Sequence, residues 1–461
     1  MKYGAKRRIY PLSGYNPEIV AVTFGKCSRS PESFDQIIKE LDADKSRKFH
    51  ERWIVGYGHK SVAEHAVLSL ALENVSILAT KVIEDNRLAS FTEKSTRYQK
   101  FDKNRYYKPP KLMASDLGKL YEETVDSYFD AYDKIVPEMF KFIEGKFPRE
   151  KGIDEKIYQS RIKNKVFDNC RYMLPVATQT NLGMTVNARE LEYAITKMLS
   201  HPLDEIKQIG DEMKKAALKV IPTLVKYAQR DDYIFETAKN LSKISKKYLS
   251  KIKADKEQAV TLVKYDKDAE EKVLTALLYK YSNFPYAKIL AQVRKMTKKD
   301  KEKIIDITLK KYQRKDQPSR ELEHAYYTFD ILMDYGAFRD VQRHRMNTQT
   351  NQFATTEHGF STPDEIVEAG FKTQYDALMK TAADTFKILS KRFPIAAQYA
   401  VPLAYKKRTL ITMNLREVYH FVRLRTGPAG HISYRRIAQE VYKEVKKVHP
   451  LLAKYIMVNL D

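Results

Sequence analysis

The feature that most constrains this chain is one set of landmarks that occurs twice, in the same order. Each set has a Glu-His pair, an apolar run that ends near an arginine, a proline in an apolar context and an Asn-x-Arg-Glu segment. The landmarks begin at Glu64, Arg87, Pro175 and Asn187 in the first set, and at Glu323, Arg345, Pro402 and Asn414 in the second. The proline precedes the asparagine by 12 residues in both sets. This repetition predicts two copies of one domain.

The length and composition agree with two globular domains. The chain has 461 residues, of which 43% are hydrophobic and 31% charged, which excludes a wholly disordered chain. The two cysteines, Cys27 and Cys170, are too few for a disulfide scaffold or a Cys-rich zinc site. We therefore expect no metal, a reducing compartment and a cytoplasmic location. The apolar stretch Ala66–Ile83 contains charged residues, so we expect a core element there and no membrane span.

The charge of the chain is strongly positive. Lysine and arginine outnumber aspartate and glutamate by 83 to 59, a net charge of +24. Such an excess favours phosphorylated or polyanionic partners, and nucleic acid is a possible but not favoured one, because solubility alone also explains the charge. The most basic stretch, about Ser242–Lys256, is either a linker or a solvated amphipathic helix. We place a basic linker at 241–255, between a first repeat at 1–240 and a second repeat at 256–461.

Helical patterns dominate the chain, and a few short stretches have the character of strands. Ser30-Pro31-Glu32 is typical of a helix start, and the helix that it opens is predicted to run to about Trp53. Strands are expected at Ile19–Thr23, Val67–Leu72, Ala259–Val263 and Lys406–Thr412. Long helices with fewer strands favour an α+β or an α/β layered domain.

Polar clusters follow the apolar run in each repeat. In the first repeat, the segment from Arg87 to Tyr98 brings hydroxyls, a carboxylate and two arginines together. Because serine, threonine and arginine suit phosphate oxygens, this segment is either a phosphate site or a polar turn with a surface arginine. In the second repeat, Arg343-His344-Arg345 is either a pyrophosphate site or a solvated helix end.

Several polar residues have a structural interpretation beside the functional one. Ser61 and Glu64 form a capping-box pattern, which leaves His59 and His65 unexplained. Asn187 and Asn414 each have a glutamate three residues later, so both are expected to cap helices.

These motifs resemble the flavin-dependent thymidylate synthases, the ThyX family, over nearly the whole chain and twice. The family has Arg-His-Arg, seven residues and then a serine, and neither repeat has both parts. The first repeat has Asp85-Asn86-Arg87 but keeps Ser95, whereas the second keeps Arg343-His344-Arg345 but has Phe353 in place of the serine. The resemblance therefore implies two degenerate copies with complementary defects.

The resemblance also implies a fold, a reaction and a set of site residues. Each domain is expected to be a mainly antiparallel sheet packed with long helices, an α+β fold. The implied reaction is reductive methylation of dUMP to dTMP, with FAD as cofactor and NADPH and 5,10-methylenetetrahydrofolate as co-substrates. The implied substrate-binding residues are Ser90, Glu93, Ser95, Thr96, Arg97, Tyr98, Arg171 and Arg343. The implied cofactor-binding residues are His59, Ser61, Arg343, His344, Arg345, Asn187, Arg189, Asn414 and His420. Arg425 is implied to be catalytic, because a cation near the uracil carbonyls stabilises negative charge there.

The complementary defects indicate how working sites are built. Sites of the family lie at subunit interfaces of a homotetramer, so the resemblance implies a homodimer of this chain with composite sites that use both repeats. Ser95 and Arg343 are then expected to approach each other. Two alternatives stay open. One is a degenerate relative that binds nucleotide or nucleic acid without catalysis, and the other is a flavin enzyme that acts on another uracil compound.

Overall fold

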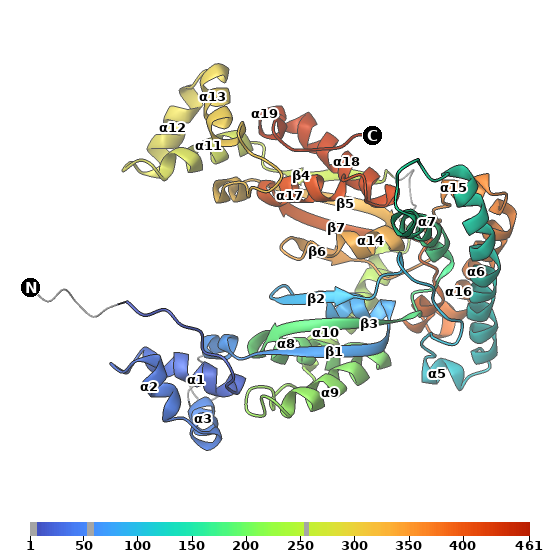
Figure 1. Cartoon of the computed structure of the whole chain (residues 1–461), viewed down its shortest axis with the longest axis horizontal. Coiled ribbons are helices and arrows are strands. Elements are labelled where there is room, and N and C mark those ends of the chain that lie inside the picture. Colours follow the sequence, from blue (N-terminus) through green and yellow to red (C-terminus); the bar gives the residue numbers. More distant parts are fainter. Residues whose placement is uncertain (1–6, 53–59, 253–257) are drawn as a thin grey trace, which may run out of the picture. The chain divides into compact units, whose positions relative to one another are not determined.

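The chain forms two compact units in the computed structural model, which describes residues 7–52, 60–252 and 258–461 (Figure 1). Unit 1 contains the described residues up to Lys94 together with Gln179–Ile252. Unit 2 contains Ser95–Thr178 together with the described residues after Ile252. The compact units therefore differ from the sequence boundaries 1–240, 241–255 and 256–461, because residues 95–178 of the first repeat belong to unit 2. The tandem repeats stay a prediction about the sequence.

The centre of unit 1 is a three-stranded antiparallel sheet in the order β1-β3-β2. Its strands are β1 (Val67–Ser76), β3 (Gln179–Asn187) and β2 (Ala89–Glu93). Met184 of β3 lies opposite Leu70 of β1 and Phe91 of β2. Alternate residues of β3 are buried, which is the pattern of an antiparallel sheet with one face covered.

Helices cover one face of this sheet in Figure 1. α8 (Ala188–Leu199) follows β3, and α9 (Asp204–Leu218) packs against β1 and α8. The other elements of unit 1 are α1 (Pro17–Cys27), α2 (Phe34–Lys39), α3 (Ala43–His50), the 3-10 turn η2 (Lys60–His65), α4 (Ile77–Ile83) and α10 (Asp232–Leu249).

Unit 2 contains a four-stranded antiparallel sheet in the order β4-β5-β7-β6. Its strands are β4 (Val260–Tyr265), β5 (Tyr326–Asp334), β7 (Lys406–Asn414) and β6 (Thr348–Asn351). Phe329 of β5 pairs with Ile411 of β7, and both side chains are fully buried. α18 (Ile432–Val448) packs against β4 and β5, and α17 (Leu415–Arg425) packs against β7. Two antiparallel sheets with separate helical layers confirm the α+β prediction.

The remaining helices of unit 2 surround this sheet or form a helical layer of their own. In that layer, α6 (Gly118–Lys146) packs against α7 (Glu155–Cys170) and α16 (Lys372–Arg392). The others are α5 (Pro110–Met113), η3 (Arg171–Met173), α11 (Ala269–Tyr279), α12 (Tyr286–Lys295), α13 (Lys298–Leu309), η4 (Arg320–His324), α14 (Tyr335–Val341), α15 (Asp364–Glu368), η5 (Ala396–Ala400) and α19 (Pro450–Ala453).

The two sheets share one order of elements. In unit 1, β1 leads into α4 and β3 leads into α8, and in unit 2, β5 leads into α14 and β7 leads into α17. The helix cap between β3 and α8 corresponds to the helix cap between β7 and α17. Asn187 accepts a hydrogen bond from the Glu190 amide at 2.9 Å, and Asn414 accepts one from the Glu417 amide at 2.8 Å. The prediction that these asparagines cap helices is therefore confirmed.

Three of the four predicted strands are confirmed, because Val67–Leu72, Ala259–Val263 and Lys406–Thr412 coincide closely with β1, β4 and β7. The strand predicted at Ile19–Thr23 is wrong, since these residues lie in α1. The Asn16 side chain caps that helix by accepting a hydrogen bond from the Glu18 amide at 2.8 Å, and a proline occupies its first position. These start signals outweigh the strand preference of the β-branched residues.

The single long helix predicted from Ser30 is also wrong. The chain forms two short helices, α2 and α3, of which the first begins only after Ser33. Asp42 starts the second by accepting a hydrogen bond from the Lys45 amide at 2.7 Å. A second strong cap inside the apolar pattern therefore divides it. Trp53, the predicted end, lies outside the described residues.

The basic stretch after residue 240 is largely helical. α10 extends to Leu249, and none of its residues is buried. Its apolar side chains Leu241 and Ile244 are 57% and 50% exposed. The part of the basic stretch that lies in α10 is therefore a solvated amphipathic helix, which is one of the two predicted alternatives. Across the described ranges, every helix is too short or too polar to cross a membrane.

Candidate functional site

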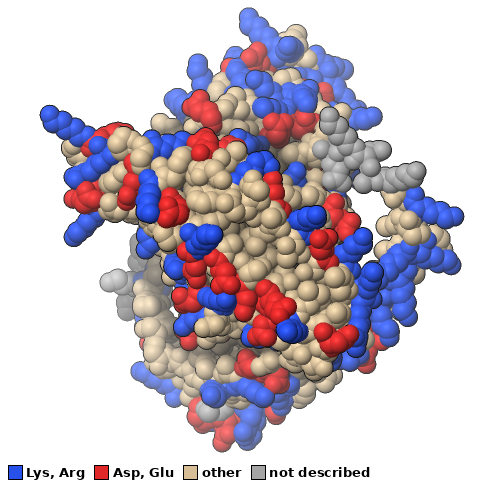
Figure 2. All heavy atoms as spheres, turned by 90° about the vertical axis from the view of Figure 1, so that its right-hand side faces the viewer, with Lys and Arg blue, Asp and Glu red and all other residues tan. Residues whose placement is uncertain are grey.

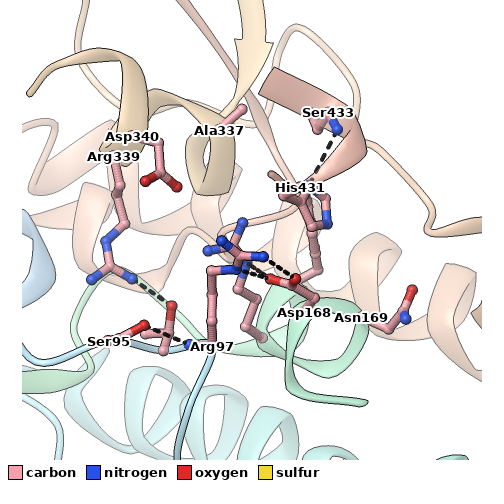
Figure 3. Close-up of polar contacts among 12 residues, drawn as sticks. Ser95, Arg97, Asp168, Asn169, Ala337, Arg339, Asp340, His431 and Ser433 are labelled. Atoms are coloured by element: carbon pink, nitrogen blue, oxygen red, sulfur yellow. Dashed lines mark hydrogen bonds and ion pairs between the residues drawn. The ribbon is translucent and has the colours of Figure 1, made fainter. Parts of the chain in front are cut away.

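Three segments of unit 2 bring arginine and aspartate side chains together (Figure 3). Thr96 and Arg97 lie in the segment after β2, and Asp168 lies near the end of α7. Arg339 and Asp340 lie in α14. The first two segments belong to the first repeat, and α14 belongs to the second. Figure 3 shows Arg97 turned toward Asp168.

Polar contacts hold Arg97 and Arg339 in place. Arg97 donates from Nε and Nη2 to the two carboxylate oxygens of Asp168, at 2.6 and 2.7 Å. Its backbone amide donates to the Ser95 hydroxyl at 3.1 Å. Arg339 donates from Nη1 to the Thr96 hydroxyl at 2.8 Å. Because a bidentate pair fixes a planar guanidinium, the orientation of Arg97 is set before any ligand binds.

Arg171 is a buried cation with donors to spare. Its side chain is 2% exposed, and its Nε lies 3.8 Å from the nearer carboxylate oxygen of Asp168. Nε and Nη2 are buried and make no hydrogen bond within the described residues. A buried guanidinium that lacks acceptors is costly, since it has lost its hydration. These donors are therefore suited to an anionic ligand.

Asp340 lies among arginines and is 8% exposed. Its Oδ1 is 3.8 Å from Nη1 of Arg343 and 3.6 Å from Nη1 of Arg425. Burial by itself would raise the pKa of this carboxyl, but the charges of Arg171, Arg343, Arg425 and Arg97 hold the pKa below its ordinary value. Asp340 is therefore ionised at neutral pH.

His344 links Arg425 to a carboxylate. Arg425 donates from Nε to His344 Nε2 at 2.9 Å, and His344 Nδ1 lies 2.6 Å from Glu417 Oε1. The imidazole is 2% exposed, and burial lowers its pKa despite the nearby glutamate. His344 is therefore neutral at neutral pH.

The charges of this region do not cancel. We call its five arginines the arginine cluster: Arg97, Arg171, Arg339, Arg343 and Arg425. Against them stand the three carboxylates Asp168, Asp340 and Glu417, so five positive charges less three negative ones leave two. A phosphate dianion offers acceptor oxygens that match guanidinium forks and relieves this excess. A cavity of about 480 Å³ adjoins the cluster at Asp168 and is also lined by His431.

Unit 1 contains a second hollow that includes a predicted cofactor residue. The cavity measures about 550 Å³ and is lined by Ser61, His65, Phe24, Lys26 and Phe49, among others. The His65 ring lies 4.7 Å from the Phe24 ring. Aromatic walls with a cation at the rim suit a flat ring that carries an anionic group. His59, predicted beside Ser61, lies outside the described residues.

Two predicted residues in β2 face different surroundings. Glu93 is buried, accepts a hydrogen bond from the Thr80 hydroxyl at 3.0 Å and lies 3.1 Å from the Lys81 ammonium. Lys81 also pairs with Glu84. These contacts engage Glu93 inside unit 1. Ser90 is exposed.

The other predicted residues divide between the units. Arg189 of unit 1 forms an ion pair with Glu64. His420 of unit 2 has its ring 5.3 Å from the His344 ring, and Tyr98 is 54% exposed. The predicted site residues of unit 1 are Ser61, Ser90, Glu93, Asn187 and Arg189. Those of unit 2 are Ser95, Thr96, Arg97, Tyr98, Arg171, Arg343, His344, Arg345, Asn414, His420 and Arg425.

The sequence analysis did not select the carboxylates of this region. Asp168 precedes Arg171 by three residues, and Asp340 precedes Arg343 by three. On a helix this spacing places the two side chains on one face, so it was an available signal. Glu417 had appeared as a helix-start residue and not as a partner of histidine. In the described ranges, no group of three or more His, Cys, Asp or Glu residues is placed to hold a metal ion.

Comparison with a known family matches the chain twice. Residues 12–223 and 261–451 match the family described as thymidylate synthase complementing protein. The two matches together cover most of the chain, and each lies inside one of the predicted repeats.

Individual proteins are similar to different shares of this chain. A UPF0159 protein from Chlamydia muridarum is 33% identical over 432 residues, which are 90% of this chain and 82% of that protein. A flavin-dependent thymidylate synthase from Clostridium tetani is 30% identical over 215 residues, which are 46% of this chain and 82% of that protein. A match that covers most of a relative but only about half of this chain is expected if this chain contains two copies of the domain. A crystal structure of the flavin-dependent thymidylate synthase ThyX from Helicobacter pylori, complexed with FAD and dUMP, covers 43% of this chain and 100% of that chain, with 18% identity and a TM-score of 0.33.

Proposed function

This chain belongs to the thymidylate synthase complementing protein family, and we propose on that premise that it is a flavin-dependent thymidylate synthase. The proposed reaction is the reductive methylation of dUMP to dTMP, with 5,10-methylenetetrahydrofolate as carbon donor and NADPH as reductant. The proposed site combines Ser95, Arg97 and Arg171 of the first repeat with Arg343 and Arg425 of the second.

The observation that carries this proposal is the meeting of the two repeats in the arginine cluster. Each repeat lacks a different part of the family pattern, and the parts that remain lie in the same compact unit. The hydrogen bond from Arg339 to Thr96 joins residues 243 positions apart, at 2.8 Å. This contact lies within one chain, so the homodimer implied by the resemblance is not needed to form it. The homodimer is a separate proposal.

The proposed phosphate-binding groups are the spare donors of Arg171, the Nη1 group of Arg97, which does not take part in the pair with Asp168, and the Ser95 hydroxyl. Arg171 alone offers two buried N–H groups that make no hydrogen bond within the described residues. Charge-assisted hydrogen bonds to a phosphate are among the strongest that a protein makes. The phosphate would therefore anchor dUMP at Arg171.

Arg425 is proposed to act on the pyrimidine ring. Its guanidinium is held by His344 at 2.9 Å and lies 3.6 Å from Asp340, so its position is set in advance. A fixed cation at a uracil carbonyl oxygen stabilises negative charge that gathers there during the reaction. Because the charge on Arg425 is permanent, this stabilisation requires no proton transfer.

Each unit, taken by itself, contains residues proposed to bind FAD. In unit 1 the cavity with Ser61, Phe24 and Lys26 fits a flat ring with an anionic tail. In unit 2 the Arg343 side chain is 44% exposed and open to a ligand, beside His344 and His420. When bound, FAD would accept a hydride from NADPH and deliver one to the pyrimidine.

A second candidate is a relative that binds a nucleotide without catalysis. The engagement of Glu93 by Lys81 favours it, because a carboxylate predicted to face ligand is instead paired inside unit 1. Binding of nucleic acid has less support. On the face shown in Figure 2, lysine and arginine side chains are interspersed with aspartate and glutamate and do not form one uniformly basic surface.

The test is a visible absorption spectrum of the purified chain after FAD has been added and the excess removed, recorded with and without dUMP. We expect a retained flavin band that shifts with dUMP, and dUMP-dependent NADPH oxidation with dTMP as product when methylenetetrahydrofolate is present. Binding of dUMP without flavin retention would favour the second candidate. Absence of both flavin and dUMP binding would contradict the proposal and the second candidate alike.

A further inference from the structure

The contact between Arg425 and His344 restricts where the imidazole carries its proton. The Nε–H of arginine donates hydrogen bonds and never accepts them. His344 Nε2, at 2.9 Å from this group, must therefore present a lone pair. A neutral imidazole has one N–H, so the proton resides on Nδ1, which lies 2.6 Å from Glu417 Oε1. Glu417 is the acceptor for that proton.

We propose that Glu417 is a positioning residue, which selects the Nδ1–H tautomer of His344 and thereby holds the guanidinium of Arg425 in place. Without an acceptor at Glu417, the proton is free to reside on Nε2, where it faces the Nε–H of Arg425. Two donors cannot bond to each other, so Arg425 would turn away. The effect on catalysis rests on the proposed function, whereas the tautomer itself does not.

The surroundings of His344 make this selection effective. Its imidazole is 2% exposed, and it packs edge-on against the Phe421 ring at 4.9 Å. Glu417 is itself fixed, because its backbone amide donates to the Asn414 cap at 2.8 Å and its side chain is 14% exposed. In a site from which water is largely excluded, a single acceptor decides the tautomer.

Acid is expected to break the same contact. The titratable and charged groups that act on His344 include Glu417, Arg425 and His420 of α17, and Asp340 of α14 lies 3.6 Å from Arg425. Burial, Arg425 and His420 lower the pKa of His344, and Glu417 raises it. Below that pKa both ring nitrogens carry protons, and Nε2 then opposes the Nε–H of Arg425. Arg425 is therefore released as the pH falls.

The first repeat supplies an internal comparison. Glu190 follows its cap Asn187 by three residues, as Glu417 follows Asn414. The positions of His344 and Arg425 are occupied there by Asn86 and Met198. The Asn86 amide donates to the Ile83 carbonyl instead. Glu190 therefore occupies the same position at the start of its helix as Glu417 does, but the residues that correspond to His344 and Arg425 are different. This makes Glu190 a matched control position.

The experiment uses the full chain labelled with ¹⁵N-histidine and records imidazole nitrogen shifts by NMR. The His344 signals are assigned by their loss in His344→Gln. We expect the Nδ1–H tautomer in the wild type and in Glu417→Gln, whose amide oxygen still accepts a hydrogen bond. In Glu417→Leu we expect the Nε2–H tautomer or a mixture, and Glu190→Leu should change nothing. An Nε2–H tautomer in the wild type, or an unchanged tautomer in Glu417→Leu, overturns the proposal.

Kinetics then test the consequence for Arg425. Glu417→Leu should lower kcat for dUMP-dependent NADPH oxidation about tenfold or more with little change in KM for dUMP, and Glu417→Gln should restore most of it. Because Glu417→Gln removes a charge that raises the pKa of His344, the acid limb of kcat should move to lower pH. Unchanged kcat and an unchanged acid limb in an active enzyme overturn this role. An inactive wild type contradicts the proposed function, while the tautomer measurement still decides the assignment of Glu417.

Discussion

Arg171 and Gln398 occupy corresponding positions of the two predicted repeats and differ in their hydrogen bonds. Arg171 precedes Pro175 by four residues, and Gln398 precedes Pro402 by four. The oxygen and the nitrogen of the Gln398 amide both make hydrogen bonds, since the oxygen accepts from the Ala354 amide at 2.9 Å and the nitrogen donates to the Ile395 carbonyl at 3.0 Å. Arg171 keeps two buried donors without hydrogen bonds in the described residues. The glutamine stabilises a loop, whereas the arginine is suited to bind a ligand.

Replacement of Arg171 by glutamine is expected to change ligand affinity and stability in opposite directions. The variant loses a cation that binds phosphate, so the affinity for dUMP should fall about 30- to 100-fold, about 2–3 kcal/mol. The free chain no longer buries a charge with spare donors, so its free energy of unfolding should stay level or rise. Calorimetric titration and urea unfolding measure the two effects. Arg161→Gln, at an exposed position of the preceding helix α7, is the control and should change neither.

At the scale of elements, helix α10 differs from its neighbours. It has 18 residues, with apolar side chains along one side and lysines along the other, and none of its residues is buried. Helices in proteins owe most of their stability to the packing of an apolar face, and an isolated helix of this length is only marginally stable. α10 therefore depends on local factors such as the Asp231 cap, whose side chain accepts a hydrogen bond from the Tyr233 amide at 2.8 Å.

A matched pair of substitutions tests whether α10 is solvated in solution. Ile244→Ala in α10 should change the free energy of unfolding by less than about 0.5 kcal/mol, because Ile244 is 50% exposed. Ile195→Ala in α8 should cost about 2–5 kcal/mol, because Ile195 is fully buried. Urea unfolding of both variants gives the comparison. A cost for Ile244→Ala as large as that for Ile195→Ala would mean that the apolar face of α10 is covered in solution.

At the scale of the whole molecule, the compact units do not follow the order of the chain. Unit 2 combines residues 95–178 with the second half of the sequence, so the arginine cluster, which has residues from both predicted repeats, lies within it. Each unit also buries a histidine that the proposed reaction does not use. Burial lowers the pKa of His50 in unit 1 and of His431 in unit 2 to about 4. Stability at mildly acid pH is therefore linked to both units.

The sign of this linkage predicts acid sensitivity. In the unfolded chain these histidines bind protons near their ordinary pKa of about 6.5, whereas in the folded chain they remain neutral down to about pH 4. Stability is therefore present above pH 6.5 and falls as the pH decreases toward 4, by about 1.4 kcal/mol per pH unit for each histidine. Urea midpoints between pH 7 and 4.5 measure the slope. His50→Gln and His431→Gln should each reduce the pH dependence of the urea midpoint in one unfolding transition. An unchanged pH dependence in both variants would contradict the linkage.

The sequence by itself determined the features that depend on local pattern. It predicted the β1, β4 and β7 strands and the helix caps at Asn187 and Asn414, because strand preference and a capping side chain act over a few neighbouring residues. Local pattern left the α+β and α/β classes open, and the family resemblance implied the α+β class. The sequence also identified the types of residue that suit a phosphate. The sequence prediction was wrong where two local signals compete. At Ile19–Thr23 the helix cap and the proline outweigh the strand preference of the β-branched residues.

Only the tertiary structure decided which of these residues meet. Arg97 and Asp168 are 71 positions apart, His344 and Glu417 are 73 apart, and Thr96 and Arg339 are 243 apart. Such contacts depend on how strands pair and how α7, α14 and α17 pack on a shared core, which no short pattern specifies. For the same reason the carboxylates Asp168 and Glu417 escaped the sequence analysis. From sequence alone, a carboxylate on a helix that pairs with an arginine or a histidine cannot be distinguished from one that faces solvent. Only the packing of the fold brings the partner beside it.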